Sequence, residues 1–176
     1  MPKKRTARKA ASKTTRRPSA ARPGVPFRTV TPYLTVSDAA GAIDWYKRAF
    51  GAKELTRMPA PGGKIMHAEL MIGDSRVMLA DAFPGGDTRE PQALGGTTSN
   101  MHVYHRDVDK LWRQAVAAGA QVTMPLDDQF WGDRYGKLRD PFGYNWALSF
   151  KAKMTKQEME RKRQQVMAAM AGGTHL

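Results

Sequence analysis

An internal repeat is the feature of this sequence that most constrains its fold. The chain reads as strand, helix and three further strands, and then repeats that order. Related segments follow the two predicted helices, AFGAKE in the first copy and AAGAQV about 70 residues later. We therefore predict an α+β fold of two tandem βαβββ modules, at about residues 28–82 and 100–150. Their strands are expected to form a curled mixed sheet around a cup.

The clearest strand signal is the hairpin at residues 129–150. Its centre, Asp140-Pro141-Phe142-Gly143, has the composition of a tight turn. Polar and apolar residues alternate on both sides of the turn, which gives one polar and one apolar face. We expect helices to cover the apolar face and the polar face to line the cup.

Three helices are predicted from apolar residues at helical spacing. The first spans 38–50 and stops at Gly51, and the second spans 108–118 and stops at Gly119. The third spans 155–171 and opens with the capping box formed by Thr155 and Glu158. Its apolar stripe is interpreted as a packing surface and consists of Met159, Val166, Met167 and Met170.

The positive charge is concentrated at the start of the chain. Residues 1–24 hold nine of the 29 Lys and Arg residues and no acid, so the remainder carries 20 basic against 16 acidic residues. A segment without large apolar side chains is expected to be disordered. It is either an arm that contacts nucleic acid non-specifically or a solvated extension. The predicted organisation is thus a basic tail at 1–24, a two-module domain at 25–153 and a helix at 154–171.

Composition excludes several classes of protein. The chain has no Cys, which excludes disulfides, thiolate metal sites and a Cys nucleophile. No apolar run approaches the roughly 18 residues that span a bilayer. We expect a soluble, cytoplasmic protein without a membrane partner. The Gly- and Pro-rich stretch at 83–99 is either a linker between the modules or a flap over the cup.

The doubled pattern resembles the vicinal oxygen chelate superfamily, which includes glyoxalases, bleomycin-binding proteins and extradiol dioxygenases. The first module carries the resemblance in VSDAAGAIDWYKRAFGAKE, and the second in RDVDKLWRQAVAAGAQV and DPFGYNWALSF. HAELMIGDSRVMLAD together with MPLDDQFWGDRYGKLRDPFG is similar to the PhnB-like branch. The resemblance implies a ligand-binding cup and a homodimer.

The resemblance also indicates where metal ligands would lie. Metal-dependent members place a His or Glu on the first and fourth strands of each module. The matching positions in this chain are Thr31, Leu79, Asn100 and Ala147. None is a His or a carboxylate, so the resemblance predicts no metal there and does not firmly imply any cofactor. His102 lies two residues after Asn100 and is expected to point the same way. A divalent metal bound by His67, Glu69 and His102 is therefore an alternative.

The two predicted hairpins can be superposed by matching Ser75 to Gly143. The alternation of side chains along the strands then predicts which of them face the cup. His67 and Glu69 are the candidate catalytic groups, because H-x-E on a strand sets both side chains on one face. The alternative is that Glu69 pairs with Lys137 and that His67 is a wall residue. The candidate ligand-binding residues are Tyr33, His102, Tyr104, Trp131, Tyr135, Lys137 and Arg139. Leu79, Asp81 and Ala147 are predicted to face the cup as well.

Three functions are compatible with these observations. The first is a protein of this superfamily that binds or transforms a small, flat ligand in a cup without the usual metal ligands. The second is a metal-dependent lyase, isomerase or dioxygenase that uses His67 and Glu69. The third is a nucleic-acid-associated protein that acts through residues 1–24. Whether the chain is an enzyme, for example a glyoxalase-like lyase or isomerase, stays open at this point.

Overall fold

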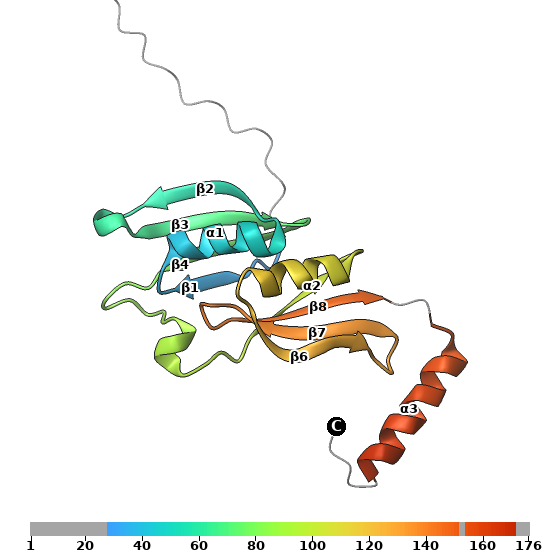
Figure 1. The fold of residues 1–176 in the computed structure, drawn as a ribbon. Coiled ribbons are helices and arrows are strands. Elements are labelled where there is room, and N and C mark those ends of the chain that lie inside the picture. Colours follow the sequence, from blue (N-terminus) through green and yellow to red (C-terminus); the bar gives the residue numbers. More distant parts are fainter. Residues whose placement is uncertain (1–27, 152–153, 172–176) are drawn as a thin grey trace, which may run out of the picture.

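A computed structural model describes residues 28–151 and 154–171. The predicted basic tail at 1–24 lies outside the described residues. The described chain has the α+β fold predicted from the repeat, with two βαβββ modules in tandem and a C-terminal helix (Figure 1).

The first module consists of one helix and a four-stranded mixed sheet. The strands follow the order β1-β4-β3-β2, with β1 parallel to β4 and the other pairs antiparallel. A short 3-10 helix, η1 (Pro61–Gly63), joins β2 to β3. The main elements are β1 (Tyr33–Val36), α1 (Ala39–Phe50), β2 (Lys53–Pro59), β3 (Ile65–Ile72) and β4 (Ser75–Asp81).

The second module repeats this arrangement with the strand order β5-β8-β7-β6. The segment between the modules contains the short 3-10 helix η2 (Pro91–Leu94). The elements of the module are β5 (Asn100–Tyr104), α2 (Val108–Ala117), β6 (Gln121–Asp128), β7 (Asp133–Arg139) and β8 (Asn145–Lys151). The two sheets stay separate and do not close into one barrel.

Local sequence signals account for the helix boundaries. The Asp38 carboxylate caps α1 by accepting a hydrogen bond from the Gly41 N–H at 2.9 Å. Gly51 ends α1 in the left-handed conformation, at φ 64°. Asp107 caps α2 through the Lys110 N–H at 3.1 Å.

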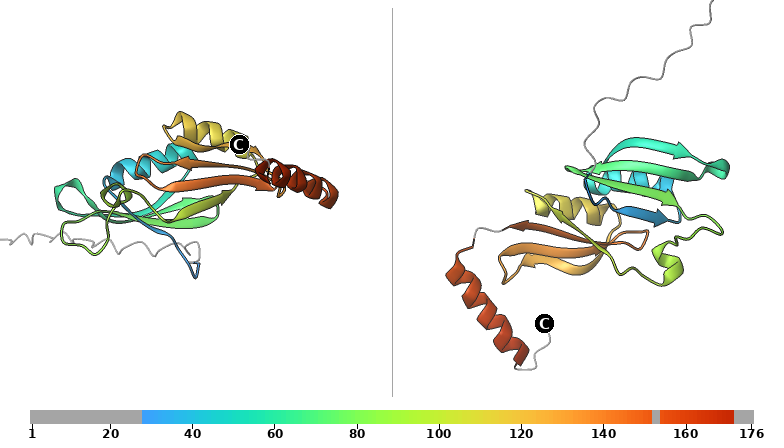
Figure 2. Two further views of the ribbon diagram at one scale, coloured as in Figure 1. Left: turned by 90° about the horizontal axis from the view of Figure 1, so that it is seen from below. Right: turned by 180° about the vertical axis from the view of Figure 1, so that it is seen from behind.

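Both helices lie on one side of the sheets and leave the other side uncovered (Figure 2). They contact each other directly, since the Trp45 indole donates to the Ala118 carbonyl at 2.8 Å. Rings from both modules meet beneath them, with Phe50 and Trp146 at a centroid distance of 4.7 Å. The apolar side chains of each sheet point toward this layer, as the alternation predicts.

Two residues expected in the cup belong elsewhere. Leu79 is fully buried in the helix-covered core, and Asp81 accepts hydrogen bonds from the Ala39 and Ile65 N–H groups. The expected parity of β4 was wrong because the two hairpin loops differ in length. Ile72 pairs with Ser75 across a two-residue turn, whereas Arg139 pairs with Asn145 across a longer one. The difference shifts β4 by one residue and exchanges its two faces.

The last helix, α3 (Lys156–Ala171), extends away from the two modules (Figure 1). Its predicted capping box is present, because Glu158 Oε2 accepts from the Thr155 N–H at 2.8 Å and Thr155 Oγ1 accepts from the Glu158 N–H at 3.2 Å. None of its side chains is buried within the described chain. Within residues 28–151 and 154–171, no helix has the length and apolarity needed to cross a membrane.

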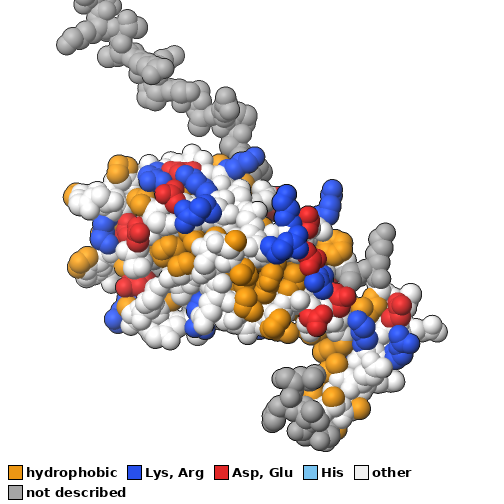
Figure 3. All heavy atoms as spheres, in the orientation of Figure 1, with side chains coloured by type: hydrophobic (Ala, Val, Ile, Leu, Met, Phe, Trp, Pro, Cys, Tyr) orange, Lys and Arg blue, Asp and Glu red, His pale blue; other side chains and the backbone are white. Residues whose placement is uncertain are grey.

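Acidic and basic side chains lie close together on the face seen in Figure 3. Lys47 pairs with Glu54 at 2.7 Å in the first module, and Arg134 pairs with Asp109 at 2.7 Å in the second. Each pair includes a residue of α1 or α2, so both lie on the helix-covered side.

Candidate functional site

The candidate site lies on the side of the sheets opposite α1 and α2. The polar face of each sheet points there, so the two modules contribute two neighbouring groups of side chains. One group is a chain of hydrogen bonds on the first sheet, and the other is a cluster of aromatic rings on the second.

A hydrogen-bonded chain crosses the open face of the first sheet. Tyr33 Oη lies 3.0 Å from His67 Nδ1, and His67 Nε2 lies 3.3 Å from Glu69 Oε1. The Arg76 guanidinium donates to the second oxygen of Glu69. In the sheet order β4 separates β1 from β3, so Tyr33 reaches His67 across the intervening strand.

Exposure falls along this chain of side chains. Tyr33 is 50% exposed, whereas the side chains of His67, Glu69 and Arg76 are 26%, 13% and 7% exposed. Partial burial raises the pKa of the Tyr33 phenol, which therefore keeps its proton at neutral pH. The chain thus runs from an open phenol to a buried ion pair.

A continuous series of aromatic rings occupies the open face of the second sheet. His102 and Tyr104 of β5 stack at a centroid distance of 4.5 Å, and the His102 ring lies 5.6 Å from that of Tyr135. Tyr135 in turn contacts the Trp131 ring edge-on at 5.5 Å. His102 Nε2 is fixed by Ser149 Oγ at 2.7 Å. We call these four rings the aromatic platform.

Strand pairing explains why these side chains meet. Tyr104 pairs with Ser149, and Ser149 pairs with Tyr135 on the next strand. Ala147 likewise lies between His102 and Lys137 in the strand pairing, and it is fully buried among its neighbours. Lys137 and Arg139 are exposed on this face, and Arg139 donates to Asn145 at 3.3 Å. Two cations therefore follow Tyr135 on the same face of β7.

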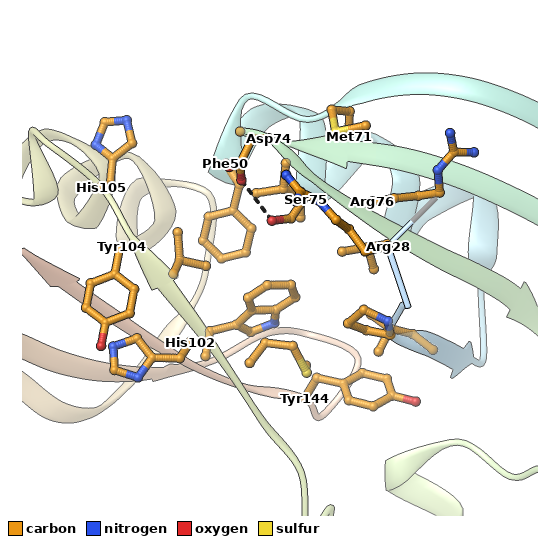
Figure 4. A pocket seen from close by; sticks show the side chains of 18 of the residues that line it. Arg28, Phe50, Met71, Asp74, Ser75, Arg76, His102, Tyr104, His105 and Tyr144 are labelled. Atoms are coloured by element: carbon orange, nitrogen blue, oxygen red, sulfur yellow. Dashed lines mark hydrogen bonds between the residues drawn. The ribbon is translucent and has the colours of Figure 1, made fainter. Parts of the chain in front are cut away.

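A cleft of about 1040 Å³ opens between the modules, next to both groups (Figure 4). Tyr33 and Arg76 line it from the first module, and His102 and Tyr104 line it from the second. β1 and β5, which border the cleft, are edge strands of their sheets. A second, smaller hollow of about 360 Å³ lies between Trp131 and α3.

The structure separates some residues that the sequence places together. His102 lines the cleft between the modules, whereas His67 and Glu69 do not, so the expectation that all three converge on one cavity was wrong for the single chain. Among the described residues, no three His, Asp or Glu side chains are grouped so that they could hold a metal ion. Glu69 pairs with Arg76 rather than with Lys137. Of the four positions matched to metal ligands, Asn100 and Ala147 lie on β5 and β8, Thr31 precedes β1, and Leu79 is in the core.

Two residues of the site were missed in the sequence. Arg76 was not named as a candidate, because the hairpin superposition shifted β4 by one residue and directed Leu79 rather than Arg76 to the cup. The correct alternation of β4 would have placed Arg76 on the open face. An Arg directly before the apolar run VMLA is expected to face either solvent or an acid. Ser149 carries no sequence signal of its own, because its role depends on the pairing of β8 with β5.

Comparison with known proteins agrees with this architecture. Residues 27–148 match the profile of the Glyoxalase/Bleomycin resistance protein/Dioxygenase superfamily. An uncharacterized protein of Mycobacterium bovis, Mb0911c, is 49% identical over 122 residues, which cover 68% of this chain and 80% of that protein.

Solved structures show the same relationship. TioX from Micromonospora sp. ML1 is 34% identical with a TM-score of 0.57, covering 69% of this chain and 96% of TioX. The PhnB protein from Bacillus cereus, a putative 3-demethylubiquinone-9 3-methyltransferase, shares the fold at 18% identity and a TM-score of 0.54, covering 70% of this chain and 99% of that one. The resemblance inferred from the motifs is therefore confirmed, and the chain belongs to the glyoxalase/bleomycin resistance protein/dioxygenase superfamily.

Proposed function

We propose that this protein binds a small, flat, anionic molecule on the open face of its sheets. The observation that carries the proposal is the aromatic platform of His102, Tyr104, Tyr135 and Trp131. Rings that lie at contact distance along one exposed face offer a surface on which a planar ligand can stack. Scattered exposed aromatics would not carry the same argument, because single exposed apolar residues are common.

The charges around the platform suggest the polar part of the ligand. Lys137 and Arg139 are exposed beside the rings on β7. An Arg side chain presents a planar set of donors that suits a carboxylate. An aromatic carboxylate therefore represents the class of ligand that the site would favour.

We further propose that the protein acts as a homodimer in which a second copy helps to enclose the ligand. The face that holds the platform is uncovered in the single chain, and the cleft beside it is bordered by two edge strands. Unpaired strand edges are commonly covered in native proteins. Tyr104 is 66% exposed at one such edge, a position that a partner chain could cover.

A matched pair of ligands tests the binding proposal. 2-Naphthoate and decalin-2-carboxylate share a carbon skeleton and a charge, but only the first is flat and aromatic. Isothermal titration is expected to show tighter binding of 2-naphthoate, and the Tyr135→Leu variant is expected to weaken it about three- to tenfold, as the loss of one aromatic contact implies.

The control is Leu55→Ala, which removes an exposed apolar side chain from β2 rather than from the platform. Its affinity should equal that of the wild type. Equal affinity for the two acids, or unchanged binding in Tyr135→Leu, would contradict stacking on the platform.

A further inference from the structure

We propose that Tyr33, His67 and Glu69 form a proton relay in which Tyr33 is the group that touches the ligand. His67 is a positioning residue that takes the phenol proton, and Arg76 anchors Glu69. The relay rests on the proposed function, because it would act on a ligand held on the same open face. It requires no metal ion.

Glu69 and Arg76 determine which ring nitrogen of His67 carries the proton. Arg76 is cationic and contacts Glu69, which favours the ionised carboxylate. An ionised carboxylate can only accept hydrogen bonds, so the proton between His67 and Glu69 belongs to His67 Nε2. Neutral His67 then has a bare Nδ1, which can only accept.

The tautomer of His67 sets the direction of its hydrogen bond with Tyr33. Because Nδ1 accepts, Tyr33 Oη must be the donor across the 3.0 Å contact. The phenol proton therefore points at His67, and the oxygen lone pairs of Tyr33 are left for the ligand. The order acid, imidazole and hydroxyl is the same that orients and activates a nucleophile in catalytic triads.

Exposure identifies Tyr33 as the outer end of the relay. It is 50% exposed and lines the cleft between the modules, whereas His67 and Glu69 do not line the cleft and are less exposed. A ligand in the cleft would meet the phenol oxygen before it met the imidazole.

The proposed step moves one proton in each of two transfers. A hydroxyl group of the ligand gives its proton to Tyr33 Oη while the phenol proton passes to His67 Nδ1. The electron pair of the broken O–H bond stays on the ligand oxygen. The resulting imidazolium is stabilised by the Glu69 carboxylate, which stays ionised beside Arg76.

The second module supplies an internal control. Tyr104 is 66% exposed and also lies against a histidine, but it stacks on the His102 ring, and His102 Nε2 is engaged by a serine hydroxyl. Tyr104 thus has similar access to solvent without the relay.

Labelling of the full chain with benzenesulfonyl fluoride tests the relay without a known ligand. The phenol oxygen forms a bond to sulfur, the S–F bond breaks, fluoride leaves and the phenol proton passes to the base. Peptide mass spectrometry should find Tyr33 labelled at least about ten times faster than Tyr104, although Tyr104 is more exposed. In His67→Phe the Tyr33 rate should fall to that of Tyr104, while labelling of Tyr104 stays constant and reports that the fold is intact.

The role of Glu69 is tested by the ring ¹⁵N spectrum of His67. The wild type should show the proton on Nε2, Glu69→Gln should move population to the Nδ1–H tautomer, and Glu69→Asp should restore the wild-type pattern in part. A merely structural Glu69 would leave the tautomer unchanged.

The outcomes separate the relay from the binding proposal. Tyr33 labelled no faster than Tyr104, or equally fast in His67→Phe, overturns the relay even if 2-naphthoate binds. Fast labelling that depends on His67, without any binding of 2-naphthoate, supports the relay and overturns the proposed binding function instead.

Discussion

Tyr46 Oη donates a hydrogen bond to Asp140 Oδ2 at 2.7 Å and thereby joins the helix of the first module to the hairpin turn of the second. The same oxygen accepts from the Trp146 indole at 2.9 Å. The other carboxylate oxygen of Asp140, Oδ1, accepts hydrogen bonds from the backbone N–H groups of Phe142 and Tyr144. A turn residue is thus also a buried polar connection between the modules.

Removing the Tyr46 hydroxyl is expected to destabilise the protein. In Tyr46→Phe the buried Asp140 oxygen loses one of its two side-chain donors, which should lower the free energy of unfolding by about 1–3 kcal/mol. Urea denaturation measures the loss. Tyr104→Phe, at an exposed site, is the control and should be close to neutral. Equal stability of the two variants would show that the connection between the modules contributes little.

Stability should depend on pH through Asp140. Burial raises the pKa of this carboxyl above its unfolded value, against the hydrogen bonds that lower it. The folded state therefore binds the proton more tightly, so the contribution of Asp140 is largest below the unfolded pKa of about 3.9 and is lost as pH rises through the folded pKa. As pH rises through this range, the free energy of unfolding of the wild type should fall through the contribution of Asp140. This contribution should be absent in Asp140→Asn. Parallel curves would contradict the assignment.

Much of this fold could be predicted from the sequence because its signals are local. The alternation around Asp140, the helix end at Gly51 and the capping box at Thr155 need only neighbouring residues, and each was found where the sequence indicated. The orientation of β4 depended on a loop comparison between modules, and there the prediction failed. Whether His67 and His102 lie close together depends on how the two sheets are positioned relative to each other. Residue periodicity predicts the face of each strand but not that position.

The predicted homodimer can be tested at the edge of the cleft. Val30 is 83% exposed and lines the cleft, so Val30→Asp should weaken association through this region. Sedimentation equilibrium is expected to give the mass of two 19.5 kDa chains for the wild type and a shift toward one chain for the variant. Met58→Asp changes an exposed residue on β2 and should leave the mass unchanged. A single-chain mass at all concentrations would exclude the dimer.

The basic segment at 1–24 carries its own prediction. It holds nine of the 29 basic residues, and the remainder is nearly balanced at 20 against 16. Deletion of 1–24 should abolish retention of duplex DNA in a gel, and binding by the full chain should fall steeply with salt because counterions are released. Unchanged retention after the deletion would remove nucleic acid as a partner of this segment.

Nuclear Overhauser effects from bound 2-naphthoate test directly whether the ligand stacks on the aromatic platform. We predict cross-peaks from the naphthalene protons to the rings of Tyr104, Tyr135 and Trp131. Cross-peaks confined to Met159 and Phe130, in the hollow beside α3, would place the ligand elsewhere and would contradict the proposed site.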